Sequence, residues 1–373
     1  GGTRRREGEH GRRRSWGDAR ALGDGAGAPT SGAREMMSRR FRTQDMTGTN
    51  APTKQSAFAA MRALVTGGAG FIGSHLADAL LERGARVAVL DNFASGKRQN
   101  VPAGAQLFEV DLRDADAVHK AVAAFRPTHI FHQAAQASVK MSVDEPATDA
   151  AVNILGGLHL LDAARRVGVE RVVFASTGGA IYGEVPEGTK ATEDWPLNPK
   201  SPYGASKAAF ERYLEVYRQN FGLKYTVLRY ANVYGPRQDP FGEAGVVAIF
   251  TGRLLKGQPV TLFARREPGD EGCVRDYVWV GDVVQANLIA VERALDGCYN
   301  VGTGVGSTTR QVLAAVEAAV GVRAQVEPAP PRPGDLERSV IDASKLMQAG
   351  WSPTVALEEG IRRTVAWFRS CPS

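Results

Sequence analysis

Short apolar runs alternate along the chain with segments whose apolar residues recur at helical spacing. Residues 62–66 form the first run, and Ile72, Leu76, Leu80 and Leu81 follow it at the three- and four-residue spacing of one helix face. Further runs lie at 86–91, 106–110, 128–132 and 171–175, with helical segments between them. The alternation predicts strands and helices in βαβ order. Such an order builds a parallel, doubly wound sheet of the Rossmann type in an α/β fold.

The turn between the first strand and the first helix contains three glycines in the spacing Gly-x-x-Gly-x-x-Gly: Gly67, Gly70 and Gly73. A strand that turns here into a helix points backbone N–H groups and the positive end of the helix dipole at a pyrophosphate. The glycines permit the tight turn, the approach of the ligand, and close packing of helix on strand. An ordinary turn also uses glycine, but the pattern on both sides favours a dinucleotide site, with Phe71 and Ile72 opening the helix.

The second predicted strand ends in a carboxylate, Asp91, 18 residues beyond Gly73. A carboxylate at this position can accept hydrogen bonds from both ribose hydroxyls of an adenosine and repels a 2′-phosphate. Asp91 therefore favours NAD over NADP. Lys97 and Arg98 follow in the loop, either as solvated charges or as side chains that soften this preference.

The net charge of +6 belongs to the N-terminal tail. Residues 1–60 contain 12 Lys and Arg and 6 Asp and Glu, so that 34 basic and 34 acidic residues remain in the rest of the chain. The tail has few large apolar side chains and is expected to be disordered. Its arginine runs are either a solvated extension, which we prefer, or a contact for nucleic acid or a membrane surface. We therefore expect no nucleic-acid partner.

The cysteines give no sign of a disulfide framework or of a metal site. Cys273, Cys298 and Cys371 form no Cys-x-x-Cys pair and have no histidines at ligand spacing. A reducing cytoplasm fits this composition. No apolar stretch approaches the roughly 20 residues of a membrane span, so we expect no membrane association.

Candidate catalytic groups follow the fifth apolar run. That run ends at Ser176 and Thr177, and hydroxyls at the carboxyl end of a parallel strand lie where such sheets bind ligands. Tyr203 and Lys207 open the next helix and project from one face because they are four residues apart. A nearby ammonium favours the phenolate of a tyrosine. Tyr203 can then take a proton from a substrate hydroxyl as a hydride leaves for NAD, while Thr177 or Ser176 bonds the reacting oxygen.

These motifs, in this order, resemble the extended short-chain dehydrogenase/reductase family over residues 61–373, and within it most closely the nucleotide-sugar 4-epimerases. The resemblance implies an NAD-binding domain at 61–229 and 282–305, and a smaller C-terminal α/β substrate domain at 230–281 and 306–373. It also implies a homodimer formed through the Tyr203 helix and a neighbouring helix. Besides the glycine turn, Asp91, Tyr203 and Lys207, the resemblance assigns to the cofactor Asn92, Asp111, Leu112, Ala134 and Ala135.

The resemblance further implies a UDP-sugar substrate. Two arginines in family-like motifs are expected to bind its diphosphate through planar, charge-assisted contacts. The residues assigned to the substrate are Asn232, Val247, Phe263, Arg275, Arg332, Asp335 and Ser339.

The segment after Thr177 indicates the reaction. Family members that dehydrate or decarboxylate the sugar carry acidic groups there, whereas this chain has Gly178 and Gly179. Without a further acid or base, the 4-keto intermediate can only turn over and take the hydride back, so we expect 4-epimerisation. The two glycines also make this segment one residue longer than in the commonest epimerases, which leaves the choice between Ser176 and Thr177 open.

The sugar itself stays open between several UDP-linked candidates. Ser339 stands where the family has a pocket-wall residue, and a small side chain there leaves room for an N-acetyl group. We prefer exchange of UDP-glucose and UDP-galactose, with UDP-glucuronate and UDP-N-acetylhexosamines as alternatives. Two remoter alternatives are a nucleotide-sugar reductase with net redox turnover and a non-catalytic protein that senses NAD or binds nucleic acid.

Overall fold

The computed structural model describes residues 58–240, 245–332 and 334–371. The disorder expected for the tail therefore lies, except for residues 58–60, outside the described residues. Phe58 is buried with Met61 in the core. The core thus includes one residue, Phe58, that we had assigned to the tail.

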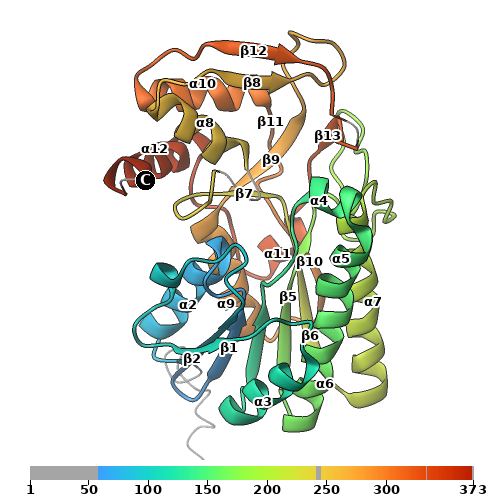
Figure 1. Cartoon of the computed structure of the whole chain (residues 1–373). Helices are drawn as coiled ribbons and strands as arrows, with labels where there is room; N and C mark the ends of the chain where they lie inside the picture. The colour runs from blue at the N-terminus through green and yellow to red at the C-terminus, as the bar shows by residue number, and fades with distance from the viewer. Residues whose placement is uncertain (1–57, 241–244, 333, 372–373) are drawn as a thin grey trace, which may run out of the picture. The chain divides into compact units, whose positions relative to one another are not determined.

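A 7-stranded parallel sheet forms the centre of the fold, in the order β10-β6-β5-β4-β1-β2-β3 (Figure 1). This confirms the predicted doubly wound sheet. The order reverses at β1, which lies between β2 and β4, and ligands of such sheets bind at this switch point. The strands are β1 (Arg62–Thr66), β2 (Arg86–Asp91), β3 (Gln106–Glu109), β4 (His129–His132), β5 (Arg171–Thr177), β6 (Lys224–Tyr230) and β10 (Gly297–Val301).

Helices cover both faces of this sheet because its strands are apolar on both sides. Leu64 of β1 joins a buried cluster with α3, α6 and α7, whereas its neighbour Val65 joins the cluster with α2 and α9. Successive strand residues point to opposite faces, so a continuous apolar run fills two cores. The helices are α2 (Phe71–Glu82), η1 (Arg98–Asn100), α3 (Ala115–Phe125), α4 (Val139–Asp144), α5 (Pro146–Ala150), the π-helix η2 (Ala151–Gly156), α6 (Gly157–Val167), α7 (Pro202–Phe221) and α9 (Val280–Glu292).

The remaining elements surround a third apolar cluster. β9 pairs with β7, β11 and β13, and β8 pairs with β12. Helices α8, α10 and α12 supply most of the other buried side chains of this cluster. The elements are β7 (Asn232–Tyr234), α8 (Val246–Leu255), β8 (Val260–Phe263), β9 (Val274–Trp279), β11 (Gly306–Thr308), α10 (Thr309–Val320), β12 (Val326–Ala329), β13 (Arg338–Ser339), α11 (Ser344–Gln348) and α12 (Leu357–Ser370).

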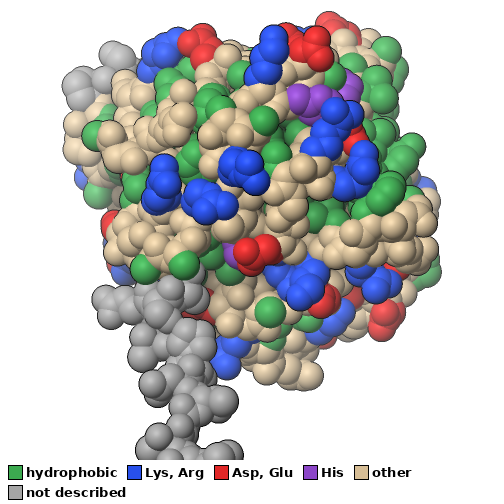
Figure 2. All heavy atoms as spheres, turned by 90° about the horizontal axis from the view of Figure 1, so that it is seen from below, with side chains coloured by type: hydrophobic (Ala, Val, Ile, Leu, Met, Phe, Trp, Pro, Cys, Tyr) green, Lys and Arg blue, Asp and Glu red, His purple; other side chains and the backbone are tan. Residues whose placement is uncertain are grey.

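The surface of the described residues carries charges of both signs. Figure 2 shows one face, on which Lys and Arg side chains are interspersed with Asp and Glu. Within the described part of the chain, no helix is both long enough and apolar enough to cross a membrane.

Candidate active site

The glycine turn is packed so closely that side chains are excluded from it. Gly67 has a φ of +67°, and a Cβ on Gly73 would lie 2.1 Å from the Gly67 carbonyl oxygen. A Cβ on Gly70 would lie 3.2 Å from that same oxygen. Helix α2 starts directly after Gly70 with neither a side-chain cap nor an acidic residue in its first turn. Its N-terminal N–H groups therefore remain available to an anion, and the residues present fit NAD.

Asp91 joins the glycine turn to the end of β2. Its carboxylate accepts hydrogen bonds from the backbone N–H of Ala69 at 2.9 Å and from that of Phe93 at 2.8 Å. A Cβ on Gly96 would lie 2.8 Å from the same carboxylate. Each carboxylate oxygen has two lone pairs, so both retain a lone pair for a ribose hydroxyl.

The other predicted cofactor residues lie at the ends of neighbouring strands. Asn92 donates a hydrogen bond to Asp111 across 2.9 Å, and Arg113 binds the same carboxylate through two nitrogens. Its hydrogen bonds with Arg113 hold the pKa of Asp111 well below its usual range, so this carboxylate is ionised. Ala134 packs against Gly67: a Cβ on Gly67 would lie 2.7 Å from the backbone nitrogen of Ala134. Leu112 is buried after β3, and Ala135 follows Ala134 beyond β4.

Tyr203 and Lys207 lie in the first two turns of α7. Ser201 caps this helix by accepting a hydrogen bond from the N–H of Gly204, which fixes where it begins. The Lys207 ammonium lies 5.9 Å from the centre of the Tyr203 ring and donates a hydrogen bond across 2.9 Å to the Ala175 carbonyl. Because Ala175 belongs to β5, this contact locks the Tyr203 helix to the strand that ends at Thr177.

Ser176 and Thr177 face different surroundings. The Ser176 hydroxyl donates a hydrogen bond to Oε1 of Glu211 across 2.6 Å, and Glu211 binds Arg229 through both of its oxygens. Ser176, Glu211 and Arg229 are all buried. Thr177 is the last residue of β5, and its Oγ1 lies 3.8 Å from the place where a Cβ on Gly179 would stand.

Gly178 and Gly179 fold the chain back onto the end of β6. Their backbone N–H groups both donate to the Tyr230 carbonyl, at 2.7 and 3.2 Å. Ser339 closes over this turn by donating from its hydroxyl to the Gly178 carbonyl across 3.4 Å. The structure thereby brings the predicted pocket-wall residue next to the end of β5.

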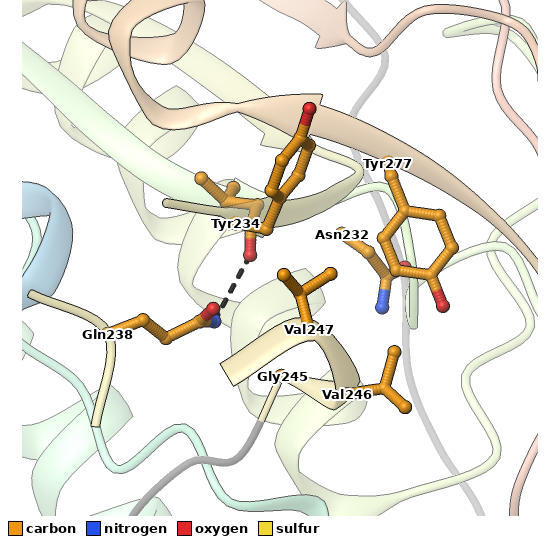
Figure 3. A pocket seen from close by; sticks show the side chains of 8 residues that line it. Asn232, Tyr234, Gln238, Gly245, Val246, Val247 and Tyr277 are labelled. Carbon is orange, nitrogen blue, oxygen red and sulfur yellow. Dashed lines mark hydrogen bonds between the residues drawn. The ribbon is translucent and has the colours of Figure 1, made fainter. Parts of the chain in front are cut away.

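A cavity of about 190 Å³ lies beside this turn, between β7, β9 and the start of α8. Figure 3 shows the side chains that line it. The predicted substrate residues Asn232 and Val247 both line it. The other lining residues, which we had not assigned to the substrate, are Val233, Tyr234, Gln238, Gly245, Val246 and Tyr277.

The sequence held a signal for Tyr277. It stands two residues after Arg275 on β9, so both side chains project from the same face of that strand. Gln238 lacked such a signal. It donates from Nε2 to the Val233 carbonyl at 3.2 Å (Figure 3), and none of the residues that the structure describes hydrogen-bonds to its buried Oε1.

The two predicted arginines occupy different places. Arg275 pairs in register with Ser339 across β9 and β13, which puts it close to the turn at Gly178. The Arg332 guanidinium stacks on the Phe263 ring at 3.6 Å from its centre, so these two predicted residues lie together. Asp335 is exposed, and its backbone N–H donates a hydrogen bond to the Arg332 carbonyl at 3.2 Å.

The wall of the cavity is also tied to the cofactor turn. His75 on α2 hydrogen-bonds to the Pro236 carbonyl at 3.0 Å, and Arg237 binds Asp78 of the same helix at 2.7 Å. Arg237 holds a φ of +66°, an unusual conformation for a residue with a side chain. These contacts connect the segment after β7 with the helix that begins at the glycine turn.

A buried polar cluster behind α7 was not predicted. Asn153 in the π-helix η2 donates to Asp149 at 3.0 Å and to Ser206 at 3.2 Å. Burial raises the pKa of Asp149. Ser206 directly precedes Lys207, so this cluster fixes α7 from a second side. Among the described residues, no group of three His, Cys, Asp or Glu is arranged to hold a metal ion.

The glycine turn, the Asp91 carboxylate at the end of β2 and the Tyr-Lys helix are the features of an NAD-dependent enzyme with a Rossmann-type sheet. The sequence profile described as the NAD dependent epimerase/dehydratase family matches residues 63–302. The chain belongs to this family, and its cofactor is NAD.

Solved structures of high similarity are named as sugar-nucleotide 4-epimerases. A Thermus thermophilus UDP-glucose 4-epimerase in complex with NAD is 66% identical; the match spans 84% of this chain and 100% of the Thermus chain, with a TM-score of 0.82. A Thermotoga maritima UDP-glucose 4-epimerase with UDP-glucose is 48% identical over 83% of this chain and 99% of the Thermotoga chain, with a TM-score of 0.78. A UDP-N-acetylglucosamine 4-epimerase from Methanobrevibacter ruminantium is 34% identical over 83% of this chain and 98% of its own chain, with a TM-score of 0.77.

Proposed function

We propose that the chain interconverts UDP-glucose and UDP-galactose by epimerisation at C4 of the sugar. The observation that carries this proposal is the contact of Lys207 with Ala175, which holds the Tyr203 helix against the strand ending at Thr177. Relatives named UDP-glucose 4-epimerase support the choice of substrate.

The proposed roles follow from the positions of the side chains. The glycine turn and Asp91 would hold NAD, which would supply the acceptor for a hydride from C4 of the sugar and the donor for its return. Tyr203 takes the proton of the 4-hydroxyl and gives it back, and the neighbouring Lys207 ammonium favours the phenolate that this requires. Thr177 donates a hydrogen bond to the reacting oxygen. Ser176 is engaged with Glu211, so we assign it no contact with substrate.

The substrate nucleotide is proposed to occupy the cavity beside β7. Asn232 and Val247 line this cavity and would hold the diphosphate and the base. Arg275 and Arg332 would contribute charge-assisted hydrogen bonds to the diphosphate, and Asp335 would accept one from the ribose. Phe263 lies under Arg332 and would complete the enclosure of the uracil.

One observation favours a second substrate class, the UDP-N-acetylhexosamines. Ser339 is small and is bonded to Gly178, so the wall near the sugar is not filled by a large side chain. A 34% identical relative is named for UDP-N-acetylglucosamine. The proposed order of preference is the hexoses first and the N-acetylhexosamines second.

The experiment mixes purified protein with UDP-galactose and no added NAD, and follows the products by NMR. Formation of UDP-glucose without added cofactor supports the proposal, whereas strict dependence on added NADPH would contradict it and indicate a reductase. A panel of UDP-glucose, UDP-N-acetylglucosamine and UDP-glucuronate then ranks the substrates by kcat/KM.

We also propose a homodimer and a cytoplasmic location. Exposed apolar side chains gather on α7 and on its neighbours α4 and η2, including Tyr213, Val216, Leu155 and Val143. Burying this surface against a second copy removes apolar area from water. The expected mass by light scattering is twice the 39.9 kDa of the chain. The three cysteines are free in the structure, as expected in a reducing compartment.

A further inference from the structure

We propose that Gly179 sets the space in which the hexose turns over, and that it thereby determines whether the oxidised sugar is re-reduced on its opposite face. This inference rests on the proposed epimerisation. Gly179 has no proposed role in binding either the cofactor or the substrate nucleotide.

A side chain at position 179 would point into the space between two proposed substrate contacts. A Cβ on Gly179 would stand 3.2 Å from Oδ1 of Asn232 and 3.8 Å from Oγ1 of Thr177. Thr177 is proposed to bond the reacting oxygen and Asn232 the diphosphate. The hexose connects these two groups, so it must lie across position 179.

The adjacent glycine has a different environment. A Cβ on Gly178 would meet Cδ1 of Ile341 at 2.8 Å and the carbonyl oxygen of Arg229 at 3.1 Å. Both neighbours are buried parts of the fold. At Gly178 the packed core excludes a side chain. At Gly179 a side chain would instead enter the space proposed for the substrate.

Backbone conformation does not require glycine at either position. Neither residue is among those with positive φ, so an alanine can adopt the same backbone without strain. The effect of glycine at position 179 is therefore the space that its missing Cβ leaves open, and not its backbone conformation.

The turn cannot restore lost space by moving outward. Its two N–H groups are both bonded to the Tyr230 carbonyl, and its Gly178 carbonyl accepts from Ser339. A methyl group at 179 would press on Asn232 and reduce the room for the sugar ring. The first transfer, in which the C4–H hydride goes to NAD and the hydroxyl proton to Tyr203, needs only one pose. Return of the hydride to the opposite face of C4, with the proton returned to the 4-oxygen, needs a second pose, which requires the ring to rotate.

The test compares Gly179→Ala with Gly178→Ala in the full chain with its bound cofactor. For Gly179→Ala we expect kcat for epimerisation to fall about tenfold or more, because displacement of reacting groups by about 1 Å can cost about a hundredfold. KM for UDP-galactose and the Kd for UDP, which lacks the hexose, should stay within about threefold. The absorbance of reduced cofactor during turnover should rise, because the 4-keto sugar either remains bound without being reduced or dissociates from the enzyme. Gly178→Ala should instead lower the melting temperature and leave the ratio of reduced cofactor to product unchanged.

Three results would overturn the inference. These are an unchanged kcat in Gly179→Ala, a loss of UDP affinity that matches the loss of kcat, and a fall of cofactor reduction in parallel with epimerisation. The last would mean that the first pose is blocked rather than the rotation. Failure of the unaltered chain both to reduce its cofactor and to epimerise any UDP-hexose would instead refute the proposed function itself.

Discussion

Ser176 and Glu211 form a buried hydrogen bond of 2.6 Å that ties the end of β5 to α7. Glu211 stands one helical turn after Lys207, and Lys207 bonds to the residue before Ser176. Strand and helix are thus joined at two successive positions, one through a backbone carbonyl and one through a side chain. Thr177 is the next residue, so its place relative to Tyr203 depends on this double attachment.

The attachment predicts different effects for the two neighbouring hydroxyls. Ser176→Ala should lower the free energy of unfolding by about 1–3 kcal/mol, because it leaves a lone pair of the buried Glu211 carboxylate without its donor. Thr177→Val should leave stability within about 1 kcal/mol and lower kcat about 100-fold or more, as loss of a donor to the reacting oxygen does. Urea unfolding and steady-state kinetics measure the two effects. A larger loss of kcat in Ser176→Ala than in Thr177→Val would reverse the assignment.

Tyr203→Phe tests the proton transfer. The rate should fall about 10²-fold or more because the general base is removed, while the ring and its packing remain. Far-UV circular dichroism and the amount of bound NAD should match those of the unaltered chain. Tyr213→Phe, on the exposed side of the same helix, is the matched control and should keep full activity. Retention of activity in Tyr203→Phe would exclude Tyr203 as the base.

The local geometry of much of the candidate cofactor site could be predicted because its parts are close in sequence. Gly67, Gly70 and Gly73 lie in one turn, and Tyr203 and Lys207 lie on one helix face, so spacing alone relates them. The partner of Ser176 could not be predicted in this way. Glu211 is 35 residues away in the sequence and contacts Ser176 because α7 packs against β5. Gln238 was missed for the same reason, because the cavity is assembled from β7, β9 and α8.

His132 predicts a dependence of stability on pH. Burial, with a smaller contribution from the Lys207 charge, lowers the pKa of His132 to about 3. The unfolded chain binds this proton at about pH 6.5, whereas the folded chain does not. Stability is therefore present above about pH 6.5 and is lost progressively as the pH falls toward about 3.

The measurement for His132 is urea unfolding at several pH values between about 7.5 and 5. His132→Gln can keep a hydrogen bond to Thr66, which His132 contacts at 2.7 Å, without the titrating group. The variant should lose less stability than the unaltered chain over this interval. Parallel curves for the two proteins would show that His132 does not cause the acid sensitivity.

Gly73→Ala tests the glycine turn. Its Cβ would lie 2.1 Å from the backbone oxygen of Gly67, so the turn must open. We expect the bound NAD of the purified protein to fall about tenfold or more, since opening displaces the N–H groups at the start of α2. Gly104→Ala is the matched control, because its Cβ would meet only Leu81 methyl groups at 3.4 and 3.6 Å. Chromatography of cofactor released from denatured protein gives the ratio, and equal NAD in both variants would contradict this role.

Asp91 has a consequence for attempts to engineer the cofactor preference. Its carboxylate fastens the N–H groups of Ala69 and Phe93 before any ribose arrives. A substitution of Asp91 that admits a 2′-phosphate removes these two hydrogen bonds together with the repulsive charge. A single substitution would therefore disrupt the loops on either side of the carboxylate. A redesign for NADP needs a second substitution that supplies a new acceptor for the two amides.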